Sequence, residues 1–112
     1  MLNQRTASSL TVALLSLACM CWPASARAQD AGEKVYKAKC AMCHGPDGGG
    51  NTPAGKSTKA RDLCSDDVKK ESDEEWTTII TNGKNKMPAY DKKISADEMK
   101  AVIAYMRSLC KK

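Results

Sequence analysis

Apolar residues recur at helical spacing in three stretches of this chain, and no stretch shows the alternation expected of a β-strand. The three stripes are formed by Val35 with Tyr36, by Trp76 with Ile79 and Ile80, and by Met99 with Val102, Ile103, Met106 and Leu109. A stripe of this kind buries one face of a helix against its neighbours. The pattern therefore predicts an all-α fold in which the last stripe, including Met99 and Met106, packs in the core.

Residues that favour helix ends bound these stretches. Asp30 is placed to cap a helix that covers 31–44. The segments 72–75 and 95–98 both read Ser-x-x-Glu, which is the spacing of a capping box, and they precede the second and third stripes. Asn-Gly at 82–83 is a typical helix stop. We therefore expect three main helices with well-defined ends.

The segment 45–63 is rich in glycine and predicts a long loop, followed by a short helix at 66–71. Within the loop, residues 50–57 match the phosphate-loop pattern G-x-x-x-x-G-K-S. That motif requires a preceding strand within a parallel α/β sheet. Because the neighbouring elements are predicted to be helices, we expect no nucleotide binding.

The first 28 residues have the features of a secretory signal peptide. Arg5 provides a positive start, an apolar run extends over 10–22, and the segment 26–28 reads Ala-Arg-Ala, a small-x-small cleavage site. We therefore predict cleavage before Gln29 and export to the periplasm. The alternative is an uncleaved membrane anchor, although the apolar run is short for a spanning helix.

Cleavage there leaves residues 29–112 as one small domain with little material for a core. This part contains no Phe and a single tryptophan, Trp76. Domains of this size usually need a staple or a cofactor. Without Arg5 and Arg27, 16 basic residues face 13 acidic ones, and the two signs are interspersed. This is typical of solvated helix faces, and no basic stripe with interleaved aromatic residues supports nucleic-acid binding.

The motif that decides the chemistry is Cys40-Ala41-Met42-Cys43-His44. Its C-x-x-C-H spacing is the attachment signature of c-type haem. Two thiols three positions apart lie on one face of a helical turn, where they can add to the two vinyl groups of one porphyrin. His44 then presents its imidazole to the iron. A haem would also supply the apolar bulk that the composition lacks.

Other interpretations of Cys40 and Cys43 are a zinc site, a redox dithiol or a structural disulfide. Zinc normally takes four Cys or His ligands, and His44 is the only histidine in the chain. A thioredoxin-type dithiol follows a strand in a βαβ unit, whereas a predicted helix precedes this motif. The haem interpretation is therefore the one that we adopt.

Two cysteines, Cys64 and Cys110, remain once the haem has taken its pair. An even number of remaining cysteines in an exported domain predicts a disulfide between them. Such a bond would close a loop of about 47 residues, for which the chain-entropy model gives about 4 kcal/mol of stabilisation. The alternative is a pair of free thiols.

Haem iron has two axial positions, and His44 fills only one of them. The other methionines of the domain lie in the attachment turn or on the core stripe (Met42; Met99 and Met106). Met87 differs because it lies in a loop and precedes Pro88, which restricts its backbone. A thioether held in this way is the candidate second ligand. Lys84 or Lys86 after deprotonation, another group, or an open position are the alternatives.

With these motifs the chain resembles the small class I cytochromes c of bacteria over most of residues 31–109. The matching residues are Gly32-x-x-x-Tyr36, Cys40-x-x-Cys43-His44-Gly45, Gly83 ahead of Met87-Pro88-Ala89-Tyr90, and a closing helix with Val102, Ile103 and Tyr105. The resemblance implies an all-α fold of three to five helices wrapped around one covalently bound haem. It also implies that the first and last helices cross near Gly32, Tyr36 and Tyr105.

The same resemblance implies further contacts of the haem and its ligand. The carbonyl of Pro53 would accept a hydrogen bond from the ring N–H of His44. Leu63, Trp76 and Ile80 would line the haem pocket. The general family pattern does not require the pair Cys64 and Cys110, so their pairing rests on the cysteine count alone.

An iron with both axial positions filled offers no site for a substrate and changes charge by one electron. We therefore predict a soluble, monomeric, periplasmic electron carrier that is not an enzyme and acts with redox proteins. Lys84, Lys86, Lys92 and Lys93 would form a basic rim for acidic partners, or serve solubility alone. If Met87 does not bind iron, a small haem enzyme of the peroxidase type or a gas-binding haem module are the alternatives.

Overall fold

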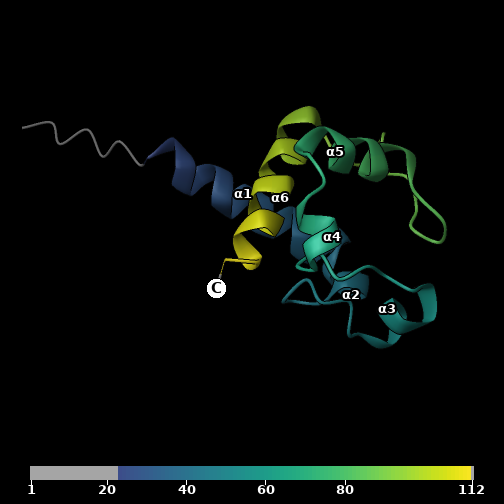
Figure 1. Ribbon diagram of the computed structural model, residues 1–112. Coiled ribbons are helices and arrows are strands. Elements are labelled where there is room, and N and C mark those ends of the chain that lie inside the picture. Colours follow the sequence, from purple (N-terminus) through teal and green to yellow (C-terminus); the bar gives the residue numbers. More distant parts are fainter. Residues whose placement is uncertain (1–22, 112) are drawn as a thin grey trace, which may run out of the picture.

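The computed structural model describes residues 23–111, and this part of the chain is helical (Figure 1). Its six helices are α1 (Ala24–Lys39), α2 (Ala41–His44), α3 (Pro53–Thr58), α4 (Asp66–Lys69), α5 (Asp73–Asn82) and α6 (Ala96–Leu109). Within 23–111 there is no strand, only an isolated antiparallel bridge between Lys84 and Met87. The all-α class is confirmed. The helices outnumber the expected three to five because α2, α3 and α4 are short separate turns.

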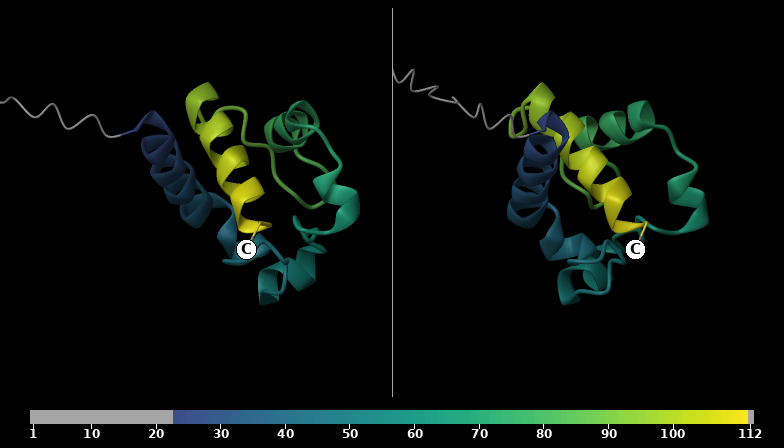
Figure 2. Two further views of the ribbon diagram at one scale, coloured as in Figure 1. Left: turned by 60° about the vertical axis from the view of Figure 1, so that its left-hand side comes forward. Right: turned by 90° about the vertical axis from the view of Figure 1, so that its left-hand side faces the viewer.

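Helices α1 and α6 lie side by side and cross (Figure 2). The crossing is close at Gly32, where an added Cβ would lie 2.1 Å from the carbonyl oxygen of Ala101. One turn later the rings of Tyr36 and Tyr105 pack with their centroids 5.4 Å apart. The buried hydroxyl of Tyr36 donates to the carbonyl of Gly45 at 2.5 Å, which ties α1 to the end of α2. The first and last helices therefore meet where the sequence predicted.

The core joins the apolar faces of α1, α5 and α6. Its buried side chains are Val35, Tyr36, Leu63, Val68, Trp76, Ile80, Ile94, Met99, Val102, Ile103 and Met106. All three predicted stripes contribute to this list, and Met99 and Met106 are buried as expected. The core is small, so the loss of one large side chain would leave few other apolar contacts to hold the helices together.

The two predicted capping boxes are present. The hydroxyl of Ser72 accepts from the backbone N–H of Glu75 at 3.1 Å, and the Glu75 carboxylate accepts from the backbone N–H of Ser72. Ser95 and Glu98 make the same pair of bonds at the start of α6. Helix α5 ends at Gly83, whose φ of 76° suits a residue without a side chain. Local sequence signals therefore set these three helix ends.

Two expectations about helix ends are wrong. Helix α1 begins at Ala24 with Pro23 in the N-cap position, so Asp30 lies inside the helix. Three alanines between 24 and 28 favour helix, and no breaker separates them from the predicted start. The segment 45–63 is also not all loop, because it contains α3. There the Thr52 hydroxyl accepts from the backbone N–H of Gly55 at 2.9 Å.

The predicted signal peptide falls mostly outside the described residues, since 1–22 are not among them. Its last residues belong to the first turns of α1, which are largely exposed to solvent up to Ala31. The buried face of α1 begins at Gly32. In the described part of the chain, every helix is too short or too polar to cross a membrane.

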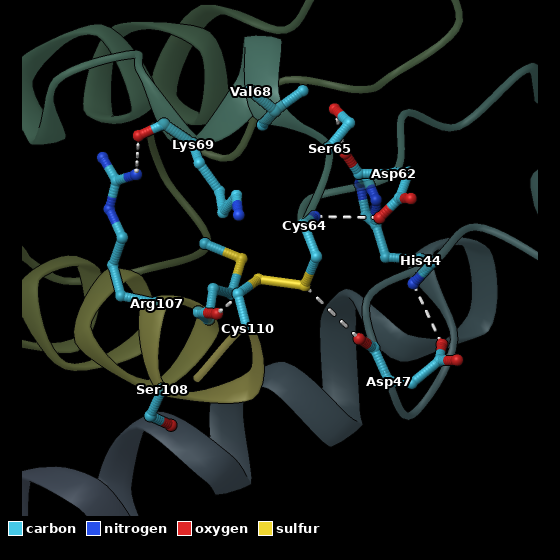
Figure 3. The surroundings of a disulfide bond; sticks show 12 residues. His44, Asp47, Asp62, Cys64, Ser65, Val68, Lys69, Arg107, Ser108 and Cys110 are labelled. Atoms are coloured by element: carbon cyan, nitrogen blue, oxygen red, sulfur yellow. Dashed lines mark hydrogen bonds between the residues drawn. A yellow bond between two sulfur atoms is a disulfide. The ribbon is translucent and has the colours of Figure 1, made fainter. Parts of the chain in front are cut away.

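A disulfide joins Cys64 to Cys110, with an S–S distance of 2.05 Å (Figure 3). Cys64 follows Leu63 in the segment before α4, and its backbone N–H donates to the carboxylate of Asp62 at 2.8 Å. Cys110 is the C-cap of α6. The bond therefore fastens the end of the last helix to the middle of the chain.

The double variant Cys64→Ser/Cys110→Ser should lose about 4 kcal/mol of unfolding free energy, because a loop of about 47 residues is no longer closed in the unfolded chain. Denaturant unfolding of the haem-loaded protein measures the loss. Lys111→Ala, which changes an exposed side chain next to Cys110, is the control and should change stability little. An unchanged midpoint in the double variant would contradict the expectation.

Candidate functional site

The C-x-x-C-H motif occupies the corner between α1 and α2. The backbone N–H of Cys40 donates to the carbonyl of Tyr36 at 2.9 Å, so Cys40 ends α1 just before α2 begins. The hydroxyl of Thr52 donates to the carbonyls of Met42 and Cys43 at 2.6 and 3.0 Å. These bonds hold the short helix α2 in place. The thiols of Cys40 and Cys43 are free, and Met42 is exposed on the outer side of the turn.

Two adjoining pockets form one cleft, because they share Cys40, His44, Arg61, Ile79 and Met87. The outer half is lined in addition by Cys43, Tyr90 and the lysines at 39, 59, 84 and 86. The inner half is lined in addition by Leu63, Val68, Glu71, Trp76, Ile80 and Met106. The cleft therefore brings together every predicted iron ligand and haem contact except Pro53. It also includes Met106, which the sequence placed only in the core.

His44 is oriented by one hydrogen bond. Its ring Nδ1 lies 3.1 Å from the backbone carbonyl oxygen of Arg61. A carbonyl can only accept, so Nδ1 carries the proton and Nε2 keeps a free lone pair. Burial lowers the pKa of His44, which favours the neutral imidazole, although the Arg61 carbonyl acts in the opposite direction. A neutral ring with Nε2 free is the form that binds a metal.

The expected acceptor for His44 was the carbonyl of Pro53, and this was wrong. Pro53 is the first residue of α3, so its carbonyl points along that helix. It also lines neither half of the cleft. The acceptor is the carbonyl of Arg61, in the segment between α3 and α4. No sequence signal marks it, because any residue can supply a backbone carbonyl.

Met87 lies in a loop that is tied down on both sides. Within the loop, the backbones of Lys84 and Met87 exchange two hydrogen bonds of 3.1 and 2.9 Å. The ammonium of Lys86 donates to the carbonyl of Ser57 at 3.2 Å, which links the loop to α3. The hydroxyl of Tyr90 donates to the carbonyl of Lys39 at 3.1 Å, which links it to the end of α1. Met87 is therefore held in the wall of the cleft.

Arg107 packs behind the inner half of the cleft, against Trp76. This residue was not identified from the sequence. Its guanidinium carbon lies 3.8 Å from the ring centroid of Trp76. The same group bonds the Asp73 carboxylate at 3.0 Å and the carbonyls of Lys69 and Glu71 at 3.0 and 2.5 Å. The indole N–H of Trp76 donates to the Val68 carbonyl at 3.3 Å. Trp76 is thus fixed on its face and at its nitrogen.

The residues of the cleft fit a covalently attached haem. Two free thiols, one neutral imidazole and one thioether line a space whose inner walls are apolar. Burial raises the pKa of the Cys40 thiol to about 11, whereas a redox dithiol has a lowered one. Within residues 23–111 no three Cys, His, Asp or Glu side chains are gathered as a metal-binding group, which a zinc site would need.

Comparisons with known proteins agree with this chemistry. Residues 27–106 match the protein family described as cytochrome C oxidase, cbb3-type, subunit III. The chain is 37% identical to cytochrome c6 of Leptolyngbya boryana over 76 residues, which cover 68% of this chain and 86% of the relative. It is 34% identical to cytochrome c6 of Gloeothece citriformis over 92% of both chains. It is 40% identical to cytochrome c6 of Rippkaea orientalis over 75% of this chain and 73% of the relative.

Proposed function

Starting from the fact that the chain belongs to the cytochrome c family, as a small class I member, we propose which of its residues hold the haem and how they serve electron transfer. The protein is a one-electron carrier with one covalently bound c-type haem, and it is not an enzyme. The assignment of residues rests on a single observation. Cys40, Cys43, His44 and Met87 line one cleft whose inner walls are apolar.

When bound, the haem supplies an iron that changes its charge by one electron. Cys40 and Cys43 would hold the porphyrin through thioether bonds, and His44 and Met87 would supply Nε2 and sulfur as ligands of the iron. With two ligands from the protein there would be no room for a substrate, and a thioether favours the ferrous state. Trp76 and the other inner walls exclude water from one side, while the outer half is left for contact with partners.

The Met87→Ala variant tests this assignment. Without the thioether, the ferrous protein should bind carbon monoxide readily, whereas the unchanged protein should react poorly. The equilibrium constant for reduction should fall about tenfold or more, at about 59 mV per tenfold for one electron. The Soret band and a redox titration measure the two effects.

Met42→Ala is the matched control, because Met42 is 77% exposed and lies outside the cleft. It should change neither property. Rapid carbon monoxide binding by the unchanged protein would instead favour the gas-binding or peroxidase-type alternatives. If Met87→Ala behaves like the unchanged protein, Met87 is not the ligand.

We further propose that the carrier is exported to the periplasm, cut before Gln29 and active as a monomer. The turns of α1 before Gly32 are largely exposed, and residues 23–28 contribute no side chain to the core. The disulfide suits an oxidising compartment. Met42 is the one large hydrophobic side chain exposed within the described range, which gives little apolar surface for self-association.

Mass spectrometry of protein purified from a host that exports and matures cytochromes should give the mass of residues 29–112 with one haem. Ala28→Tyr, which places a bulky residue at the small position of the cleavage site, should retain the longer chain. A mass that includes residues 1–28 in the unchanged protein would favour the membrane-anchor alternative.

The partners that we propose are redox proteins with acidic docking surfaces. Lys84 and Lys86 of the predicted basic rim line the outer half of the cleft, and Lys39 and Lys59 join them there. The described residues that line this half include no acid. Neither of the other two predicted residues, Lys92 and Lys93, lines the cleft, although the ammonium of Lys93 lies 5.5 Å from the ring centroid of Tyr90. Such a basic mouth would attract negative surfaces.

Replacing two of these lysines, in Lys59→Gln/Lys84→Gln, should slow oxidation by ferricyanide several-fold at low salt. A cationic oxidant such as a cobalt tris-bipyridine complex should react no more slowly, because the variant removes only the attraction between the lysines and an anionic oxidant. Stopped-flow rates over a range of ionic strengths measure the difference. Lys100→Gln on α6, outside the cleft lining, is the control. Equal loss with both oxidants would contradict a role in steering.

A further inference from the structure

The hydrogen bond that orients His44 depends on the backbone position of one residue outside every helix. The acceptor is the carbonyl of Arg61, and this residue lies between α3 and α4. Backbone hydrogen bonds hold the segment on either side of Arg61. The N–H of Ala60 donates to the carbonyl of Gly55 at 2.8 Å, and the N–H of Leu63 donates to the carbonyl of Gly48 at 2.9 Å. At Arg61 itself the tie comes from its side chain.

The side chain of Arg61 makes a forked ion pair with Glu71. Nη1 lies 3.1 Å from one carboxylate oxygen and Nη2 lies 2.7 Å from the other. Two parallel bonds of this kind fix direction as well as distance. Bonding to Arg61 lowers the pKa of Glu71, so the carboxylate stays charged at neutral pH. Both residues line the inner half of the cleft.

Glu71 is itself anchored to the last helix. Its backbone carbonyl accepts from Nη2 of Arg107 at 2.5 Å, and Arg107 belongs to α6. A connected path therefore runs from the His44 ring through the Arg61 carbonyl, the Arg61 side chain and Glu71 to α6. This path fixes the acceptor of the His44 proton relative to the main helix crossing.

The ion pair between Arg61 and Glu71 contributes little to the stability of the fold. Its side chains are 41% and 22% exposed, and pairs of this kind contribute about 0–1 kcal/mol. Its position matters more, because a hydrogen bond to the outer nitrogen of a metal-bound histidine raises the electron donation of the ring. A better donor favours the ferric state, so the strength of this bond influences the reduction potential.

We propose that Arg61 and Glu71 are positioning residues that set the reduction potential by holding the Arg61 carbonyl against Nδ1 of His44. The inference rests on the proposed binding of the iron by His44. Loosening the pair would weaken the hydrogen bond and make the haem easier to reduce. The role goes beyond that of a haem contact, because it acts through the geometry of another residue.

A pure charge effect predicts a different pattern from loss of positioning. The sign of the change in reduction potential distinguishes the two explanations. By charge, Arg61→Gln removes a positive group and lowers the potential, whereas Glu71→Gln removes a negative group and raises it. In Arg61→Gln/Glu71→Gln the two charge effects oppose each other and the net charge is unchanged. Loss of positioning raises the potential in all three variants. The double variant therefore isolates positioning.

Redox titration of the haem-loaded proteins should give a reduction equilibrium constant two- to threefold higher in the double variant, or about 20–30 mV at about 59 mV per tenfold. Exchange of the His44 Nδ1 proton with solvent, followed by NMR of the ferrous protein, should be faster by about tenfold or more. Arg61→Lys, which keeps the charge but not the fork, should give part of both effects.

Glu33→Gln/Lys37→Gln is the matched control, because it removes an ion pair of 2.6 Å on α1, outside the cleft lining. It should leave potential and exchange unchanged. The inference is overturned if the double variant keeps both properties, or if the single variants shift the potential in opposite directions and cancel when combined. A spectrum of the unchanged protein without histidine ligation would instead overturn the proposed function, before any variant is made.

Discussion

The close contact between α1 and α6 at Gly32 sets the spacing of the two helices to which the rest of the cleft is attached. Helix α1 leads directly into Cys40 and from there into α2 with His44. Helix α6 contributes Met106 to the inner wall and Arg107 to the brace behind Trp76. A side chain at position 32 would meet the backbone of Ala101 and separate the two helices. In so small a domain few other contacts could restore their spacing.

The two halves of the cleft differ in polarity and charge. Apart from Arg61 and Glu71, the inner half is mostly apolar and is backed by the core, and burial there favours a neutral imidazole at His44. The outer half is basic and lies between the Met87 loop and the end of α1. The ties made by Lys86 and Tyr90 keep that loop in place without closing the mouth. In the proposed function, the inner half would surround the haem and the outer half would face the redox partners.

Local signals in the sequence were sufficient for much of this structure. The two Ser-x-x-Glu boxes act over four residues, so α5 and α6 could be placed from sequence, and the C-x-x-C-H motif is contiguous for the same reason. Helix α3 was missed because its cap, Thr52, lies within a glycine-rich stretch. The partner of His44 was missed because it is a backbone carbonyl, brought there by ties from Gly55, Gly48 and Glu71. Tertiary contacts that use the backbone leave no mark on residue type.

The disulfide has a topological consequence for the resistance of the protein to proteolysis. The bond between Cys64 and Cys110 turns the intervening chain into a covalent ring that contains α4, α5, the Met87 loop and α6. A protease that cuts a single peptide bond within this ring opens it but frees no fragment, since both pieces stay joined at the sulfur atoms. A nick in the exposed turn at 91–93 would thus leave the loop and the last helix on the same molecule.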